Sequence, residues 1–321
     1  MSRVHPPVPV RIGTAGWSYE DWKGIVYPLR PPAGFDPLGL MSSLFDTNEI
    51  NSSFYRIPSV AATRGWARRV SHNPRFAFTA KLFRGFTHER TAGSPEEKEF
   101  LAAMAPLAEE GRLTAVLVQI PVSFRNSAES RRALDALLGR FDALPLAAEF
   151  RHASWDSEDT RETLARHDAL FVNIDQPWIG ENLRRTDHVA PGRAYYRYHG
   201  RNAAKWFGPN TSNEERYNYL YSEEQIGKAA ERLSSSAARA GEDPGRPGTG
   251  PVPGPGRVSG VTAILNNHFR GQAVANAIQL QHRLTGELST APASLRDTYP
   301  ALAGITEPAS PPDSQKQKPL F

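Results

Sequence analysis

The sequence predicts a single-domain α/β protein with the TIM (β/α)₈ barrel fold, in which eight parallel strands alternate with helices. Short apolar segments recur along the chain, and most of them precede a stretch with helical periodicity. Most of these segments end in polar or charged residues, as barrel strands do where they reach a functional mouth. The length of 321 residues suits one barrel of about 250 residues with an insertion and a tail.

The first strand, at 10–16, is apolar and ends in glycine, and an aromatic loop follows it. We expect the other strands at 49–51, 76–82, 115–120, 146–151, 169–175, 195–199 and 261–267. Periodicity and capping residues predict helices at 36–45, 59–70, 94–110, 127–141, 157–167 and 273–284, and one more that opens at Ser222. The helical signal after the sixth strand is weak. These elements place the barrel domain at residues 10–290.

Two segments fall outside this pattern. Residues 234–259 consist mainly of Gly, Pro, Ser and Arg, which predicts a disordered insertion before the last strand. Residues 307–321 have a similar polar composition and are predicted to form a disordered tail.

A doubly wound open sheet is the alternative fold, but Gly13 and Gly16 lack the G-x-G-x-x-G spacing of a phosphate-binding loop.

Composition excludes several classes of site. The chain has no cysteine, which rules out disulfides, thiolate zinc sites and a cysteine nucleophile. No segment is long and apolar enough to span a membrane, so the default expectation is a soluble cytoplasmic protein. The net charge of +4 comes mainly from arginine, which suits phosphate and carboxylate partners. A GC-rich genome is an equally simple reason for the arginine content, so charge alone does not define a site.

Polar residues at the strand ends are the strongest functional signal. If the apolar alternates face the helices, the polar alternates point into the barrel and meet at its carboxyl-terminal mouth. The predicted inward set comprises Glu49, Asn51, Lys81, Gln119, Glu149, Arg151, Asn173, Asp175, Arg197, His199 and one of Asn266 and Asn267. The purely structural interpretation is a buried ion network that only holds the strand ends together. Such a network is often no more stabilising than well-packed apolar residues in the same place. We therefore favour a ligand site.

The residue types in this set favour an anionic ligand. Lys81, Arg151 and Arg197 would clamp a phosphate or carboxylate, leaving nearby acids and an imidazole for proton transfer. The predicted catalytic residues are Glu49, Glu149, Asp175 and His199. The predicted substrate-binding residues are Trp17, Asn51, Tyr55, Lys81, His88, Gln119, Arg151, His152, Arg197, Arg201, Asn266 and Asn267.

A metal site is the competing interpretation of the same mouth. Oxygen and imidazole ligands for a divalent metal are available from Glu49, Glu149, Asp175, His88, His152 and His199. The three cations in the same layer would repel a metal ion, and no H-E-x-x-H motif is present. We therefore predict no cofactor and keep a divalent metal as an alternative.

Three functional hypotheses follow. The first is an enzyme of the hydrolase or isomerase/lyase type that acts on a small anionic or phosphorylated substrate, such as a sugar phosphate, by acid/base chemistry. The second is a nucleic-acid-binding nuclease or repair-type hydrolase, in which aromatic side chains around the mouth stack on bases. The third is a barrel that binds a ligand or a partner without chemistry. The sequence does not determine the oligomeric state.

Several motifs in combination resemble the domain of unknown function 72 family, also called YecE-like. They are Gly13 to Tyr19, Glu49 to Tyr55, Thr87-His88, Gln119 to Pro121, Glu149 to His152, Tyr198 to Arg201, Tyr217 to Tyr221 and Asn266-Asn267. The resemblance extends over about residues 11–285 and implies a TIM-barrel fold without implying a reaction. This chain departs from the family pattern at position 48, where it has Asn48 and family members usually have an apolar residue. This departure affects the prediction of which residues of the second strand point into the barrel.

Overall fold

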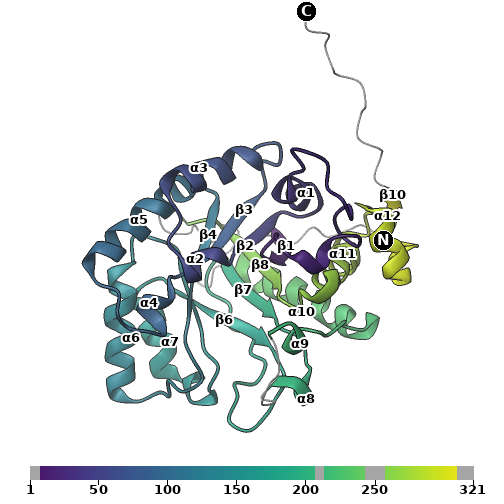
Figure 1. The fold of residues 1–321 in the computed structure, drawn as a ribbon. Coiled ribbons are helices and arrows are strands. Elements are labelled where there is room, and N and C mark those ends of the chain that lie inside the picture. The colour runs from purple at the N-terminus through teal and green to yellow at the C-terminus, as the bar shows by residue number, and fades with distance from the viewer. Residues whose placement is uncertain (1–7, 207–212, 243–256, 309–321) are drawn as a thin grey trace, which may run out of the picture.

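The computed structural model describes residues 8–206, 213–242 and 257–308. Its centre is a closed barrel of eight parallel strands in sequential order (Figure 1). The strands are β1 (Val10–Ala15), β2 (Thr47–Ile50), β3 (Ala77–Lys81), β4 (Leu113–Gln119), β5 (Leu146–Glu149), β6 (Leu170–Asp175), β7 (Arg193–Tyr198) and β8 (Gly260–Leu265). The predicted TIM-barrel fold is therefore confirmed.

Helices surround the barrel and also follow the strand ends (Figure 1). The longer helices are α1 (Pro37–Leu44), α3 (Val60–Arg69), α5 (Ser94–Glu109), α6 (Ala128–Arg140), α7 (Glu158–Arg166), α10 (Glu223–Gly241) and α11 (Gln272–Thr285). Short helical segments occupy the loops: η1 (Glu20–Trp22), α2 (Ser52–Tyr55), α4 (Arg84–Thr87), η2 (Ala153–Trp155), α8 (Ala203–Trp206), α9 (Asn213–Arg216) and η3 (Phe269–Gly271).

The register of the strands fixes which side chains point into the barrel. Glu49 pairs with Thr79, Gln119 with Glu149, and Ile264 with Arg197. Paired residues of adjacent strands share a face of the sheet, so these six side chains all face the interior. Several inward positions elsewhere carry small residues, among them Gly13, Ala15, Ala77, Ala115 and Ala147. These small residues leave room for the long side chains of β7.

The helix α10 extends into the segment predicted to be a disordered insertion. Residues 234–241 are helical, and Leu233, Ser236, Ala237 and Ala240 form one buried face at helical spacing. The prediction that the insertion begins at residue 234 is therefore wrong, because alanine and serine at these spacings suit a closely packed helix. Residues 243–256 of the predicted insertion lie outside the described residues.

The described chain also continues past residue 290. It forms β9 (Ser289–Ala291), α12 (Ala293–Thr298), η4 (Pro300–Leu302) and β10 (Thr306–Pro308). The strands β9 and β10 pair in parallel, and Leu295 and Leu302 are fully buried among residues of β1, β8 and α11. The first two residues of the predicted tail, 307–308, therefore belong to β10, and 309–321 lie outside the described residues.

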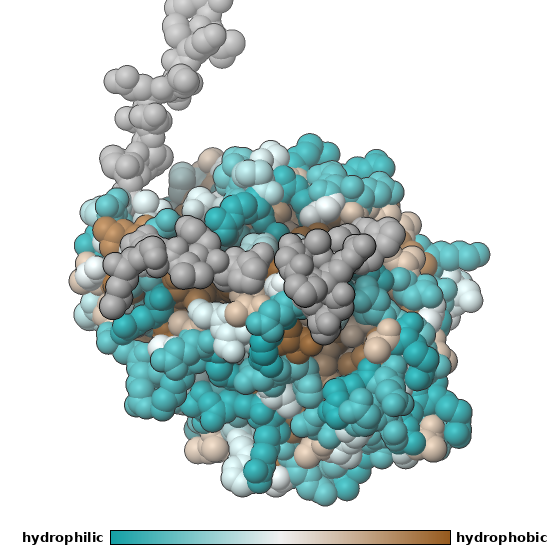
Figure 2. Space-filling model, turned by 180° about the vertical axis from the view of Figure 1, so that it is seen from behind, coloured by the Kyte–Doolittle hydropathy of each residue, from teal (hydrophilic) through white to brown (hydrophobic). Residues whose placement is uncertain are grey.

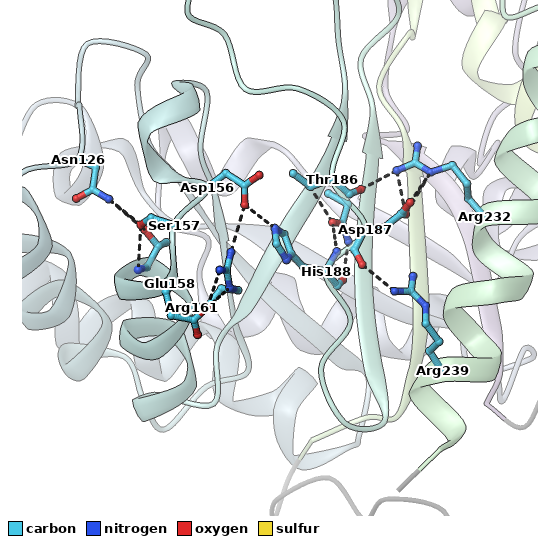
Figure 3. A network of polar contacts seen from close by, with 12 residues as sticks. Asn126, Asp156, Ser157, Glu158, Arg161, Thr186, Asp187, His188, Arg232 and Arg239 are labelled. Atoms are coloured by element: carbon cyan, nitrogen blue, oxygen red, sulfur yellow. Dashed lines mark hydrogen bonds and ion pairs between the residues drawn. The ribbon is translucent and has the colours of Figure 1, made fainter. Parts of the chain in front are cut away.

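The connection from β6 to β7, residues 176–192, contains no helix. Polar contacts hold it against the helices on either side (Figure 3). His188 Nε2 lies 3.0 Å from Asp156 Oδ1 beside α7, and Arg232 of α10 contacts the Asp187 carboxylate at 3.0 Å. These contacts take the place of the packing that a crossover helix would provide, in agreement with the weak helical signal in the sequence.

The outer surface is largely polar. The face opposite to the view of Figure 1 is mostly hydrophilic, and apolar side chains show on it only in limited areas (Figure 2). Among the described residues, no helix combines the length and the apolar character needed to cross a lipid bilayer.

The N-terminus of α10 offers a test of how its capping stabilises the barrel. Ser222 accepts a hydrogen bond from the backbone N–H of Gln225, whose side chain accepts one from Ser222 N–H. We expect Ser222→Ala to lower the free energy of unfolding by about 1 kcal/mol, because the backbone N–H of Gln225 loses the hydroxyl that accepts its hydrogen bond. Urea unfolding measures this change. Ser235→Ala, on the exposed face of the same helix, is the matched control and is expected to have no destabilising effect; equal losses in both variants would contradict the capping assignment.

Candidate active site

Arg197 forms the centre of a buried ion network inside the barrel. Its Nη2 donates to Glu49 Oε1 at 2.6 Å, and its Nη1 donates to Glu149 Oε2. The hydroxyl of Tyr195 donates to the other oxygen of Glu49 at 2.8 Å. All four side chains are fully buried. Strands β2, β5 and β7 are therefore joined through one guanidinium group.

A second layer lies next to this centre. Arg151 Nη2 is 2.5 Å from Glu149 Oε1, and Arg151 Nη1 donates to Gln176 Oε1 at 2.7 Å. The Nε2 atom of His199 is 3.4 Å from Glu149 Oε2. Glu149 is thus contacted by two guanidinium groups and one imidazole. The acids and bases predicted from β2, β5 and β7 therefore do meet in one cluster.

The tautomer of His199 follows from its neighbours. The Asn266 amide Nδ2 donates to His199 Nδ1 at 3.0 Å, which makes Nδ1 the acceptor of the neutral ring. The proton of the neutral ring then sits on Nε2, facing the Glu149 carboxylate. His199 is accordingly a hydrogen-bond donor to Glu149 in the resting protein.

Electrostatics set the charge state of these groups. Burial alone would raise the pKa of Glu149, but the positive charges of Arg151 and Arg197 outweigh it and hold the pKa well below the ordinary value. Burial, together with the nearby charge of Arg151, lowers the pKa of His199 to about 3. At neutral pH Glu149 is therefore ionised and His199 is neutral.

Lys81 lies beside this network at the end of β3. Its Nζ is 4.0 Å from Glu49 Oε1 and 5.7 Å from the centre of the Phe54 ring of α2. Burial and the nearby charge of Arg197 lower the pKa of Lys81 to about 8. Its side chain is 16% exposed and that of Arg151 is 12% exposed, whereas the two glutamates and Arg197 are fully buried. Lys81 and Arg151 are therefore the charged groups of the network that a ligand can reach.

The prediction that Asn173 and Asp175 point into the barrel is wrong. The register pairs them with Tyr196 and Tyr198, which pack against α10 on the outer side. Asp175 accepts two hydrogen bonds from Arg201, each 2.7 Å long. The inward positions of β6 are instead the apolar Val172 and Ile174, because this strand is buried on both faces and carries its polar pairs under the helices.

Asp175 and Arg201 are therefore separated from the central network. The hydroxyl of Tyr221 also donates to Asp175, at 3.1 Å, so this carboxylate is held on the helix side by three hydrogen bonds. Asn173 donates to the backbone oxygen of His188 at 2.8 Å and thereby anchors the β6–β7 connection. These contacts indicate structural roles for residues that the sequence placed in the catalytic and binding sets.

Some of the asparagines near the mouth point into the barrel, and others point towards the surrounding helices. Asn266 contacts His199 inside the barrel, whereas Asn267 donates to Tyr219 O and Asn276 Oδ1 on the helix side. Asn51 donates to the Tyr19 hydroxyl at 3.3 Å, and its Oδ1 is buried without a hydrogen-bond partner among the described residues. Asn51 and Asn266 therefore belong to the mouth, and Asn267 does not.

Four other predicted binding residues lie outside the ion network itself, and of these His88 is close enough for the charge of Lys81 to add to the effect of burial in lowering its pKa. Trp17 packs against Trp66 on the helix side, with ring centres 5.6 Å apart. His152 caps the short η2 helix. Tyr55 is 61% exposed, and His88 is exposed beside the edge of the Phe54 ring. Gln119, in contrast, faces the interior next to Glu149 through its register.

Sequence reasoning missed several residues of the site. Tyr195 lies two positions before Arg197 on the same face, so the alternation already contained the signal for it. Gln176, which accepts from Arg151, lies one residue beyond β6 and had no periodic signal. The stacked pair of Tyr19 and His268, with ring centres 4.4 Å apart, joins loops after the first and last strands and could not be read from either segment alone.

The predicted ligands for a divalent metal do not converge. Glu49, Glu149 and His199 lie in the central network, Asp175 lies on the helix side, and His88 and His152 lie in separate loops. Within the described residues, no group of three or more His, Asp or Glu side chains is arranged to hold a metal ion.

The closed barrel and its charged mouth define a TIM-barrel protein with an ion network at the carboxyl ends of its strands. The chain belongs to the family described as "protein of unknown function DUF72", whose sequence model matches residues 11–299. The family predicted from the sequence motifs is therefore confirmed.

Solved structures of the same family resemble this chain over most of its length. A DUF72 family protein from Thermotoga maritima is 32% identical with a TM-score of 0.69, covering 86% of this chain and 98% of that chain. A DUF72 family protein from Enterococcus faecalis is 26% identical with a TM-score of 0.70, covering 86% of this chain and 95% of that chain. The comparison with curated proteins found no match.

The low pKa of His199 predicts a pH dependence of stability. The unfolded chain binds a proton at this ring below pH about 6.5, and the folded chain does so only near pH 3. The free energy of unfolding should therefore fall as the pH decreases from 6.5 towards 4, by up to about 1.4 kcal/mol per pH unit from this group. Urea unfolding at several pH values measures the slope.

The slope should be smaller in His199→Asn, which removes the titrating group. His72→Asn is the matched control, because His72 is exposed to water and should leave the slope of the wild-type protein unchanged. His268, whose pKa burial lowers to about 4, contributes to the slope that remains in His199→Asn. Identical slopes in wild type and His199→Asn would show that this imidazole is not held neutral by the network.

Proposed function

We propose that this chain is an enzyme that acts on a small anionic or phosphorylated substrate at the carboxyl-terminal mouth of the barrel. The observation that supports the proposal is the charge balance of the ion network. Lys81, Arg151 and Arg197 carry three positive charges, and Glu49 and Glu149 carry two negative charges. Because His199 is neutral, one positive charge remains in excess, and a bound anion would balance it.

The positive groups have different roles in this proposal. Arg197 is fully buried and both of its Nη atoms are engaged by glutamates, so it holds the acids in place. Arg151 retains some exposure and a planar guanidinium that suits phosphate or carboxylate oxygens. Lys81 lies next to it as a second positive charge. The anion therefore binds to Arg151 and Lys81, and Arg197 supports them from below.

A buried ion network contributes little net free energy to the stability of a barrel. Removing charges from water costs several kcal/mol for each ion, and a well-packed apolar set in the same place is often as stable. Five charged side chains in the interior therefore favour a functional role for the mouth.

The group best matched to proton transfer is Lys81. Glu149 is too acidic and His199 too weakly basic to exchange a proton readily near neutral pH. A pKa of about 8 allows Lys81 to gain and lose a proton under ordinary conditions. We therefore assign the reactive role to the amine of Lys81 and the positioning roles to Glu49, Glu149 and His199.

Binding of small anions tests the proposal. We expect the wild-type protein to bind at least one member of a panel of inorganic phosphate, sugar phosphates and small carboxylates in isothermal titration calorimetry. Arg151→Ala should weaken that binding by about 10- to 100-fold, because a charge-assisted hydrogen bond is worth roughly 1.5–3 kcal/mol. Arg132→Ala, which removes the same charge from an exposed position on α6, is the matched control.

Equal weakening by both variants would show that only net charge matters, and absence of binding across the panel would contradict the proposal. Incubation of the bound compound with the protein separates the enzyme from a non-catalytic binding barrel, in which the compound stays unchanged. DNA binding that falls steeply with salt would instead favour the nucleic-acid alternative.

A further inference from the structure

Lys81 differs from the other charged side chains of the ion network in its position and its exposure. It is the last residue of β3, and its side chain crosses the ring of Phe54 with Nζ 5.7 Å from the ring centre. It is the most exposed of the five charged side chains in the network. A molecule that enters the mouth therefore meets the Lys81 amine before it meets the buried glutamates.

The amine of Lys81 is incompletely compensated by acids. Within the described residues, the nearest carboxylate oxygen to Nζ is Glu49 Oε1, at 4.0 Å, which is beyond hydrogen-bond distance. That oxygen accepts from Arg197 at 2.6 Å, and the other Glu49 oxygen accepts from Tyr195 at 2.8 Å. Glu49 is therefore engaged by other donors and does not tie Lys81 into a close ion pair.

The surroundings of Lys81 favour its uncharged form. Burial disfavours the charged form, and the guanidinium groups of Arg197 and Arg151 repel a positive charge, so that together they outweigh the attraction of Glu49 and Glu149. With a pKa of about 8, roughly a quarter of the amine is unprotonated at pH 7.5. An ordinary surface lysine is well below 1% unprotonated at the same pH. An amine beside other cations and away from water is the usual form of a nucleophilic lysine.

We infer that Lys81 is a covalent catalytic residue that forms a Schiff base with the aldehyde or ketone group of a small substrate whose carboxylate or phosphate binds Arg151. This inference rests on the proposed function and specifies its substrate class. Arg151 Nη2 contacts the same Glu149 that Arg197 holds in the network, so the anion site adjoins the layer that contains Lys81. A small compound that carries both an anionic group and a carbonyl group suits this arrangement.

The step is balanced without a further reactant. The unprotonated Nζ attacks the carbonyl carbon, and one proton passes from the nitrogen through water to the carbonyl oxygen to give a carbinolamine. The proton that the ammonium form had released to solvent returns to that oxygen, which leaves as water while the nitrogen lone pair forms the C=N bond. Counted from the ammonium form of Lys81, one carbonyl compound enters, one water leaves, and the positive charge remains on the nitrogen. The resulting iminium withdraws electrons from the neighbouring carbon, which suits isomerase and lyase chemistry.

Reductive trapping tests the inference on the 321-residue chain. The protein is incubated at pH 7.5 with glyoxylate, pyruvate or dihydroxyacetone phosphate and with sodium cyanoborohydride, and labelled peptides are mapped by mass spectrometry. We expect at least one probe to label Lys81 about tenfold or more above Lys228, an exposed lysine on α10. The labelling rate of Lys81 should increase with pH along a titration curve whose midpoint lies near pH 8, because the unprotonated amine is the attacking form.

Lys81→Arg keeps the charge and removes the reactive amine, so it should abolish the specific label. Lys228→Arg is the matched control and should leave labelling of Lys81 intact. Label spread over surface lysines, or no label on Lys81 with any of the three probes, would overturn the inference. Calorimetry with the whole panel of anions on the same sample separates the two claims. Binding of a panel member without labelling supports the anion site and contradicts the covalent step, whereas failure of both contradicts the proposed function as well.

Discussion

The guanidinium group of Arg197 binds carboxylates from two other strands inside a closed barrel, and the rest of the site depends on this contact. It holds Glu49 of β2 and Glu149 of β5, and Glu149 in turn orients Arg151 and His199. Removing Arg197 would leave two buried acids without their shared partner, a change that typically costs several kcal/mol. The network is therefore cooperative, and its members cannot be treated as independent binding residues.

The barrel interior accommodates this network because other strands carry small inward residues. Gly13 and Ala15 of β1, Ala77 of β3 and Ala147 of β5 occupy such positions. The space that larger side chains would fill in other barrels is taken by Tyr195 and Arg197. The packing and the electrostatics of the interior therefore both depend on the size contrast between the inward side chains of β7 and those of the other strands.

Exposure increases from the base of the network to its mouth. Arg197 and both glutamates are fully buried, whereas Arg151 and Lys81 are partly exposed. A buried set that fixes the geometry beneath a reachable set of cations is the arrangement expected of a preorganised anion site. The outer cluster of Asp175, Arg201 and Tyr221 is equally polar but lies under the helices, and it secures the loop after β7.

The sequence by itself determined the eight strands, the order of most helices and the inward phase of Glu49, Lys81, Glu149 and Arg197, because polar residues at alternate positions of apolar strands define a face. The tertiary structure alone decided the sides of Asp175 and Asn267, the helical state of residues 234–241 and the contacts that Arg197 makes. On a strand buried on both faces, polar residues such as Asp175 can lie under the helices as well as inside the barrel, so only the register with the neighbouring strands sets which side they face. Which charges pair, and which remain accessible, depends on distances between strands that are remote in the chain.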